Sequence, residues 1–368
     1  MNEIELTQEL VKIDSQNPTT GEKEVSKYIY DFLLDLKIQS EMLEFEKNRY
    51  EVVAELGKGS GLMFNGHIDT VPVGDANKWK YDPFSGKIIG GKLYGRGSSD
   101  MKSGAACILA AVEKMKRTDL KRRLLLTFVG DEEVSQKGSN FIIKKRHDLL
   151  KDVEYGIFGE SSSMKVTFAQ KGIVHVKIKF RGKSVHGSTP ERGVNAIEKA
   201  VKFLSNLEKL NPEMKRFGDP DLGAGTFNVG KISGGTKVNI VPDYCEVEID
   251  RRLVPKENPK LALDQFKKIL KLSGVNGEIE FLSESRPAMK IPKNSELVKL
   301  VQKFSGAKAE VSTGYMEAEL FKTERGIDCV AYGPGLSECA HIVDEYVPVK
   351  NLEKATIVYG KLISAWCH

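Results

Sequence analysis

Residues 61–69 read GLMFNGHID, an apolar run that ends in a polar cluster. The same form recurs further along the chain, in RLLLTFVGDEE (123–133), EYGIFGES (154–161) and GIDCVAYGPG (326–335). Apolar runs of this length suit strands that are buried on both faces. Between them lie stretches whose apolar residues recur at helical spacing, notably 103–116 and 135–150. Alternating buried strands and helices predict an α/β domain whose mostly parallel sheet carries helices on both faces.

The segment from about 174 to 284 follows a different pattern. GIVHVKIKFRGKS (172–184) and DYCEVEIDRRLV (243–254) alternate apolar with polar residues, as half-buried strands do. Amphipathic helical stretches follow at 194–209 and 258–273. The order strand, helix, strand, strand, helix, strand is typical of a small α+β sandwich, and the α/β pattern then resumes. We therefore predict an inserted domain, with boundaries 1–173 and 285–368 for the discontinuous first domain and 174–284 for the insertion.

The composition agrees with a globular protein of two domains. The chain has 368 residues, of which 40% are hydrophobic and 29% charged, and domains usually hold roughly 100–200 residues. The net charge is only +5, which is too small to indicate nucleic-acid binding. The longest apolar run, AACILAAV (105–112), is far shorter than the roughly 18 residues that cross a bilayer.

The cysteines and the N-terminus both favour a cytoplasmic protein. MNEIELTQELVKI mixes acidic residues with spaced apolar ones and lacks the features of a signal peptide. The five cysteines are scattered, odd in number and without CxxC spacing. This pattern indicates neither a disulfide framework nor a thiolate zinc site, and a reducing compartment suits it.

Potential metal ligands follow each of the predicted strands. In open α/β sheets, ligands gather at the carboxyl ends of the strands, so these side chains should converge. A glycine-rich turn, GRGSSDMKSG (95–104), adds a further carboxylate. The candidates are His67, Asp69, Asp100, Glu132, Glu133, Glu160 and His341. Each residue alone is a weak signal, but together they crowd negative charge that a cation would neutralise. Mixed histidine and carboxylate ligands suit Zn²⁺, Mn²⁺ or Co²⁺.

The motifs along nearly the whole chain resemble those of the M20 metallopeptidase and amidohydrolase family, which includes acetylornithine deacetylase and succinyl-diaminopimelate desuccinylase. The matching segments are GHIDTVPVGD (66–75), KWKYDPFSGKIIGGKLYGRGSSDMKSG (78–104), GDEEVSQKGS (130–139), GES (159–161), HGSTPERGVNA (186–196), NIVPDYCEVEIDRRLVP (239–255) and HIVDEYV (341–347). The resemblance implies a phosphorylase/hydrolase-like catalytic domain with a mixed, mostly parallel sheet. It also implies an inserted ferredoxin-like domain that serves as lid and dimerisation domain.

The resemblance further implies two metal ions, most often zinc, bridged by Asp100. One ion would also be held by His67 and Glu160, and the other by Glu133 and His341. Asp69 would accept the second ring N–H of His67 and so set its tautomer.

Glu132 matches the family's general base. It would take a proton from the water between the metals and pass it to the departing amine. The residues alone do not distinguish the roles of Glu132 and Glu133, since only one of the adjacent pair can face the metals directly.

The inserted domain carries the remaining candidates. By resemblance, His186 would donate to the oxyanion of the tetrahedral intermediate across a homodimer. Asn239 and Arg252 would bind a substrate carboxylate, which the fork of an arginine suits. A structural alternative for Arg252 is an ion pair with Asp250 or Glu248 on the same strand.

Two departures from the family pattern limit the substrate assignment. Ser161-Ser162 stands where many relatives have Pro-Thr, and Met316 and Glu317 stand where Thr and Asp are common. The second loop borders the substrate pocket in the family, and Gly314 beside it is a candidate substrate contact.

The sequence therefore predicts a cytoplasmic, homodimeric metal hydrolase that acts in amino-acid biosynthesis. Its substrate would be an N-acyl amino acid, such as acetylornithine or succinyl-diaminopimelate, and neither nucleic acid nor a membrane is an expected partner. A dipeptidase or carboxypeptidase with the same machinery remains an alternative. A non-catalytic binding protein is a more distant one, since every ligand and the base are present.

Overall fold

The computed structural model describes residues 1–18, 21–115 and 120–368, which divide into two compact units. Unit 1 comprises Met1–Phe168, Ile291–Glu310 and Met316–His368. Unit 2 comprises Ala169–Lys290 and Val311–Tyr315. The predicted insertion, 174–284, lies inside unit 2.

Unit 1 is built on a mixed sheet with the order β1-β2-β6-β3-β7-β15-β8. Its four central strands, β6, β3, β7 and β15, run parallel, and the strands on either side run antiparallel to their neighbours. The short strands β13 and β14 pair with β8 where it leaves the unit. The strand bounds are β1 Ser40–Glu46, β2 Arg49–Leu56, β3 Gly61–His67, β6 Arg123–Val129, β7 Val153–Phe158, β8 Val166–Gln170, β13 Met289–Lys290, β14 Ala309–Ser312 and β15 Asp328–Ala331.

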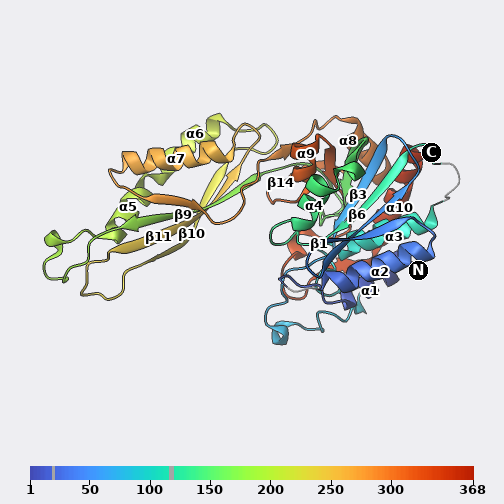
Figure 1. Ribbon diagram of the computed structural model, residues 1–368, viewed down its shortest axis with the longest axis horizontal. Coiled ribbons are helices and arrows are strands. Elements are labelled where there is room, and N and C mark those ends of the chain that lie inside the picture. The colour runs from blue at the N-terminus through green and yellow to red at the C-terminus, as the bar shows by residue number, and fades with distance from the viewer. Residues whose placement is uncertain (19–20, 116–119) are drawn as a thin grey trace. The chain divides into compact units, whose positions relative to one another are not determined.

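Helices cover both faces of this sheet, as the sequence predicts. Helices α1, α3, α8 and α10 form one layer, and α2, α4 and α9 form the other (Figure 1). Their bounds are α1 Glu3–Lys12, α2 Glu22–Asp35, α3 Lys102–Lys114, α4 Lys137–Lys145, α8 Glu296–Ser305, α9 Ala318–Arg325 and α10 Val349–Cys367. Side-chain caps mark several starts: the side chain of Asn2 accepts from two backbone amides of α1, and Ser295 caps α8. No described helix is both long enough and apolar enough to pass through a bilayer.

The central parallel strands end at the same edge of the sheet. His67, the last residue of β3, pairs with Val129 at the end of β6, and Phe158 at the end of β7 pairs with Ala331 at the end of β15. The loops that follow these strands therefore start side by side. A small sheet with the order β16-β5-β4 adds to this unit, with bounds β4 Ile88–Ile89, β5 Lys92–Tyr94 and β16 Tyr346–Pro348.

One glycine pair lets helix α3 approach this edge. A Cβ on Gly104 would lie 2.0 Å from the carbonyl oxygen of Gly159, so no other residue fits there without displacing the backbone. Asp100 precedes α3 and Glu160 follows Gly159, so this close contact brings the two carboxylates together.

Unit 2 is a four-stranded antiparallel sheet with helices on one face (Figure 1). The sheet order is β10-β11-β9-β12, and the chain order β9, α5, β10, β11, α7, β12 is the predicted strand and helix pattern. Phe180, Phe203 and Phe266 are fully buried between the sheet and the helices. The bounds are β9 Gly172–Arg181, α5 Ala196–Leu207, α6 Asn211–Arg216, β10 Thr226–Gly234, β11 Tyr244–Leu253, α7 Pro259–Leu272 and β12 Glu278–Phe281.

Candidate metal centre

The strand-end residues of unit 1 converge, as expected from the parallel sheet. They fall into two groups that share one carboxylate, and within each group the potential ligand atoms all lie within 4.8 Å of one another. One group is His67, Asp100 and Glu160, and the other is Asp100, Glu133 and His341.

The shared carboxylate lies between the two histidines. Asp100 Oδ1 lies 3.4 Å from His67 Nε2, and its Oδ2 lies 3.1 Å from His341 Nε2. His341 Nε2 is also 3.0 Å from Glu133 Oε1. The two oxygens of one aspartate therefore face two separate clusters of ligands.

Burial and charge shift the pKa of almost every group in this cluster. Burial raises the pKa of Glu160 and of Glu132 well above the usual value, and it also raises the pKa of Glu133. Hydrogen bonds with Asp100 and Glu133 raise the pKa of His341 to about 10. Burial works against ionisation of Asp100, but the neighbouring rings of His341 and His67 outweigh it and lower the pKa of that carboxyl.

These observations fit a cationic ligand. Oε1 of Glu160 is buried and has no hydrogen-bond partner among the described residues, and Oδ1 of Asp100 has only the His67 ring, 3.4 Å away, beside it. Buried carboxylate oxygens normally have a partner, because leaving them without one costs free energy. A divalent cation would supply it and would reverse the rise in carboxyl pKa.

The histidine tautomer is set by a main-chain oxygen, which differs from the sequence-based expectation. His67 Nδ1 lies 3.0 Å from the carbonyl oxygen of Asp69, and a carbonyl can only accept, so Nδ1 carries the proton. Nε2 is thus left with its lone pair on the side that faces Asp100. The prediction that the carboxylate of Asp69 accepts this N–H is wrong in the acceptor atom, since that carboxylate lies 3.7 Å away.

The Asp69 carboxylate instead holds the segment that carries the two glutamates. Its Oδ1 accepts the backbone N–H of Glu132 and its Oδ2 that of Glu133, each at 3.1 Å. Asn17 donates to the same carboxylate. Asp69 is fully buried and positions this turn through the main chain.

Glu345 positions the turn that carries Asp100 through backbone N–H groups, as Asp69 does for the two glutamates. The sequence analysis did not identify this role of Glu345. Its carboxylate accepts the backbone N–H groups of Gly97, Ser99 and Asp100 at 3.1, 2.8 and 2.9 Å, and it pairs with Arg96. Glu345 follows His341 by four residues, so it ties the two ligand-bearing segments together. Nothing in the local sequence marks this role, because its partners lie about 250 residues away.

At both positions where the sequence departs from the family pattern, a side chain forms a hydrogen bond within unit 1: Ser162 at the first and Glu317 at the second. Ser162 Oγ accepts the N–H of Gly333 at 2.9 Å, which joins the ends of β7 and β15. Glu317 is fully buried and accepts from Ser139 Oγ at 2.5 Å, and burial raises its pKa to about 7. Met316 is buried as well. Gly314 lies in unit 2, where its N–H donates to Ser312 Oγ at 3.0 Å.

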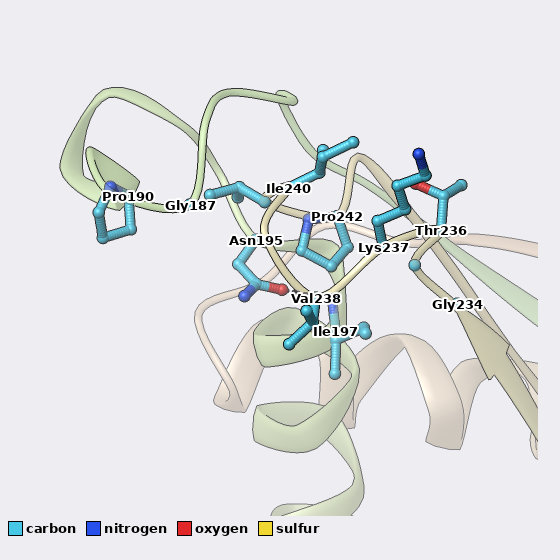
Figure 2. A pocket seen from close by; sticks show the side chains of 12 residues that line it. Gly187, Pro190, Asn195, Ile197, Gly234, Thr236, Lys237, Val238, Ile240 and Pro242 are labelled. Carbon is cyan, nitrogen blue, oxygen red and sulfur yellow. Dashed lines mark hydrogen bonds between the residues drawn. The ribbon is translucent and has the colours of Figure 1, made fainter.

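The structure brings two predicted residues of unit 2 together. His186 forms an isolated bridge with Ile240, and the N–H of Gly187 donates to the carbonyl of Asn239 at 2.8 Å. The side chains of both His186 and Asn239 are exposed. A surface pocket of about 550 Å³ adjoins them, and Figure 2 shows its lining, which includes Asn195, Lys237 and Val238.

Two contacts with Ser188 bear on the tautomer of the neutral His186 ring, the first being Ser188 Oγ at 2.7 Å from Nδ1. The backbone N–H of Ser188 donates to Nδ1 at 3.2 Å, so Nδ1 accepts and the proton of the neutral ring sits on Nε2. His186 therefore presents a ring N–H at the surface of unit 2.

Arg252 forms an ion pair with Asp250, the structural alternative to binding a substrate carboxylate. Its Nε lies 2.9 Å from Asp250 Oδ1, and its second terminal nitrogen lies 3.0 Å from Oδ2. The fork is thus satisfied by a carboxylate of its own strand, and about a quarter of the side chain is exposed.

Comparison with known proteins identifies the family and similar folds. A family model described as peptidase family M20/M25/M40 matches residues 63–365. The chain is 30% identical to acetylornithine deacetylase of Proteus mirabilis over 99% of this chain and 96% of that protein. It is 28% identical to a probable succinyl-diaminopimelate desuccinylase of Staphylococcus aureus, over 97% of each. An M20 family metallo-carboxypeptidase from Sulfolobus solfataricus has a similar fold, with a TM-score of 0.82 and 22% identity over 100% of this chain and 99% of that one.

Proposed function

The chain belongs to peptidase family M20/M25/M40 and is a metal-dependent hydrolase of amide bonds, and from this premise we propose that it removes the acyl group from an N-acyl amino acid. The observation that carries the proposal is the pair of ligand groups that share Asp100. The two full-length relatives named above, a deacetylase and a desuccinylase, support this substrate class. The expected substrates are acetylornithine or succinyl-diaminopimelate, and the reaction belongs to amino-acid biosynthesis.

We propose that two divalent ions bind at this centre, most simply Zn²⁺, with Co²⁺ or Mn²⁺ as substitutes. His67, Asp100 and Glu160 would hold one ion, and Asp100, Glu133 and His341 the other. Imidazole and carboxylate ligands without cysteine are typical of catalytic zinc sites. When bound, such a pair of ions polarises the substrate carbonyl and lowers the pKa of water.

Glu132 is the proposed general base. Its carboxylate interacts electrostatically with His67, Glu160 and Glu133, so it lies close to the candidate ligands, where a general base has to stand. Its backbone N–H is fixed by Asp69, while the neighbouring Glu133 contacts His341. This arrangement leaves the carboxylate of Glu132 to remove a proton from the attacking water and to deliver it to the departing amine.

His186 is the proposed oxyanion donor. The tautomer imposed by Ser188 leaves its Nε2–H available to a ligand, which is what the role requires. In the family pattern this donor comes from the partner subunit, so we also propose a homodimer. Strand β10 supports this proposal, since it is an edge strand, nearly all of it is exposed, and it carries the apolar side chains Val229 and Ile232.

Arg252 and Asn239, with Gly314 as a further contact, are the proposed binding groups for the substrate carboxylate. Arg252 already holds one carboxylate, Asp250, so a substrate would share its fork or displace that partner. A cytoplasmic location remains a proposal as well. The five cysteines are free thiols, as a reducing compartment would keep them.

A hydrolysis screen tests the proposed function. Apo-protein would be reconstituted with Zn²⁺, Co²⁺ or Mn²⁺ and assayed for free amine on N-acetylornithine, N-succinyl-diaminopimelate, other N-acyl amino acids and simple dipeptides. Turnover of one N-acyl amino acid well above the dipeptides is the expected result, and the Glu132→Gln variant controls for contaminating hydrolases. Preference for dipeptides would overturn the deacylase assignment in favour of a peptidase.

A further inference from the structure

Glu132 lies on a turn whose backbone is unusually constrained. Asp131, the residue before it, has a positive φ of 67°, which is rare for a residue with a side chain. Its carbonyl oxygen accepts from the N–H groups of Ser135 and Gln136, at 3.2 and 2.6 Å. One oxygen of its carboxylate accepts the N–H of Lys137 at 3.1 Å. The conformation of Asp131 therefore determines where the next residue points.

The other oxygen of Asp131 is held by a buried arginine. Arg49, the first residue of β2, is 9% exposed, and one of its terminal nitrogens lies 2.7 Å from Asp131 Oδ1. Glu46 lies 3.0 Å from the same nitrogen, and Glu22 pairs with the other. One guanidinium thus serves three carboxylates from three segments of the chain.

Arg49 also reaches the same turn by a second route. Its second terminal nitrogen donates to the side-chain oxygen of Asn17 at 2.7 Å, and the amide nitrogen of Asn17 donates to Asp69. Asp69 in turn accepts the backbone N–H groups of Glu132 and Glu133. Arg49 therefore contacts this turn in two ways. It binds the side chain of Asp131 directly, and it is linked through Asn17 and Asp69 to the backbone N–H groups of Glu132 and Glu133.

Stability alone does not require such an arrangement. A buried ion pair is often no more stabilising than apolar side chains of similar volume, because its charges lose their hydration. The planar fork of arginine can fix several acceptors at set angles, which the single ammonium of lysine cannot do. This geometry suits a residue whose role is to hold several acceptor groups in fixed orientations.

We infer that Arg49 is a positioning residue that sets the orientation of the proposed base, Glu132, through Asp131 and the Asn17–Asp69 relay. The inference rests on the proposed function for the catalytic role of Glu132, but the contacts that support it belong to the chain itself.

The chain offers a matched control in Arg123. This arginine begins β6, the strand that ends at the turn, and is 8% exposed. It pairs with Glu55 and donates to the carbonyls of Lys151 and Leu149. Arg123 is therefore a buried arginine with several hydrogen bonds of its own, at the end of β6 that lies away from this turn.

The experiment compares Arg49→Lys with Arg123→Lys in the full chain reconstituted with Zn²⁺. Hydrogen–deuterium exchange of residues 130–137, zinc content and thermal midpoint would be measured, together with kcat and KM on the best substrate of the hydrolysis screen. Both variants should lower the thermal midpoint. Only Arg49→Lys should speed exchange at 130–137 and lower kcat, by roughly 10²-fold, as a misplaced catalytic group does. KM and zinc content should stay near the wild-type values.

Equal exchange at 130–137 in the two variants, or an equal fall in kcat, would overturn the inference, because Arg49 would then be a structural residue only. If Arg49→Lys failed to fold, Asn17→Ala would take its place, since it removes the relay and leaves the ion pairs. That variant should speed exchange at Glu132 and Glu133, and unchanged exchange there would equally overturn the inference. A wild-type chain that hydrolysed no compound would contradict the proposed function, while the exchange comparison would still decide the role of Arg49.

Discussion

The two units of this protein differ in how far their candidate functional side chains are exposed to solvent. In unit 1, the side chains of His67, Asp100 and Glu133 are 1%, 13% and 7% exposed, and Asp69 is fully buried. In unit 2, His186 and Asn239 lie on exposed loops and Arg252 is paired on the sheet surface. Most of the groups proposed for the metal centre are buried, with the half-exposed His341 as the exception, whereas the candidate groups of unit 2 face solvent.

This difference shows that the candidate metal ligands of unit 1 are the preorganised groups of the protein. Asp69 and Glu345 each fix a ligand-bearing turn through backbone N–H groups, so contacts within the chain set the backbone positions of the candidate ligands. Charged groups held in this way need little reorganisation during a reaction. In unit 2 the local contacts set a tautomer at His186 and an ion pair at Arg252, but they do not enclose a site. Substitutions in the two units should therefore differ in size and in kind.

The largest effect should come from removing the shared ligand in unit 1. Asp100→Ala should reduce turnover to background, because both ligand groups lose a member and the ions' effects on carbonyl and water are lost together. Zinc per chain would be measured by elemental analysis, with Asp75→Ala, an exposed aspartate, as the control. Retention of two ions and of turnover in Asp100→Ala would contradict the shared-ligand assignment.

Next in size should be the loss of the base. Glu132→Gln or Glu132→Ala should keep the fold and the bound zinc and lose roughly 10²–10⁴-fold in kcat, the range of general acid–base catalysis. Steady-state kinetics and zinc content together would check this. Near-normal turnover in either variant would show that another group removes the proton.

A test in unit 2 would show whether an exposed residue can matter as much. His186→Ala should lower kcat by roughly 10²–10³-fold, as loss of one oxyanion donor does, without loss of zinc. His175→Ala is the matched control, because His175 is a partly exposed histidine of the same unit, near Asp250 and Ser283. Equal rates for the two variants would remove His186 from the site.

A smaller effect on catalysis is expected for Arg252, which is already paired with Asp250 of unit 2. Arg252→Ala should raise KM by roughly tenfold with little change in kcat, since one charge-assisted contact is lost. Asp250→Ala should lower KM by freeing the fork for the substrate. If Asp250→Ala raised KM as much as Arg252→Ala, the pair would serve the sheet and not the substrate.

The smallest effect concerns stability and a buried charge of unit 1. Glu51 on β2 is fully buried, neither carboxylate oxygen has a hydrogen-bond partner among the described residues, and burial raises its pKa well above 4.5. The folded state thus holds this proton more tightly than the unfolded state, so stability falls as the pH rises above about 4.5.

Glu51→Gln should therefore raise the thermal midpoint more at pH 8 than at pH 5. Glu154→Gln, on the exposed side of β7, is the control and should show no such difference. An equal gain at both pH values would mean that Glu51 has the same proton affinity in both states.

The fold class and the set of candidate ligands could be read from the sequence. Buried strands, amphipathic helices and turns are local patterns, and the positions of His67, Glu133 and Glu160 after strands follow from the rule for parallel sheets. The pattern does not extend to Arg49, Asn17, Glu345 or Glu317. Apart from Glu46, which is three residues from Arg49, their side-chain partners lie about 30 to 250 residues away, and those of Glu345 include backbone N–H groups, which every residue except proline has.

The sequence alone thus determined the architecture and the residues able to bind metal, because periodicity and residue chemistry are properties of short segments. Only the tertiary structure decided how those residues are held. It assigned the His67 N–H to the carbonyl of Asp69, turned the carboxylate of Asp69 toward Glu132 and Glu133, and paired Arg252 with Asp250. Each of these choices depends on which acceptor comes within hydrogen-bond distance, and only the folded backbone sets that.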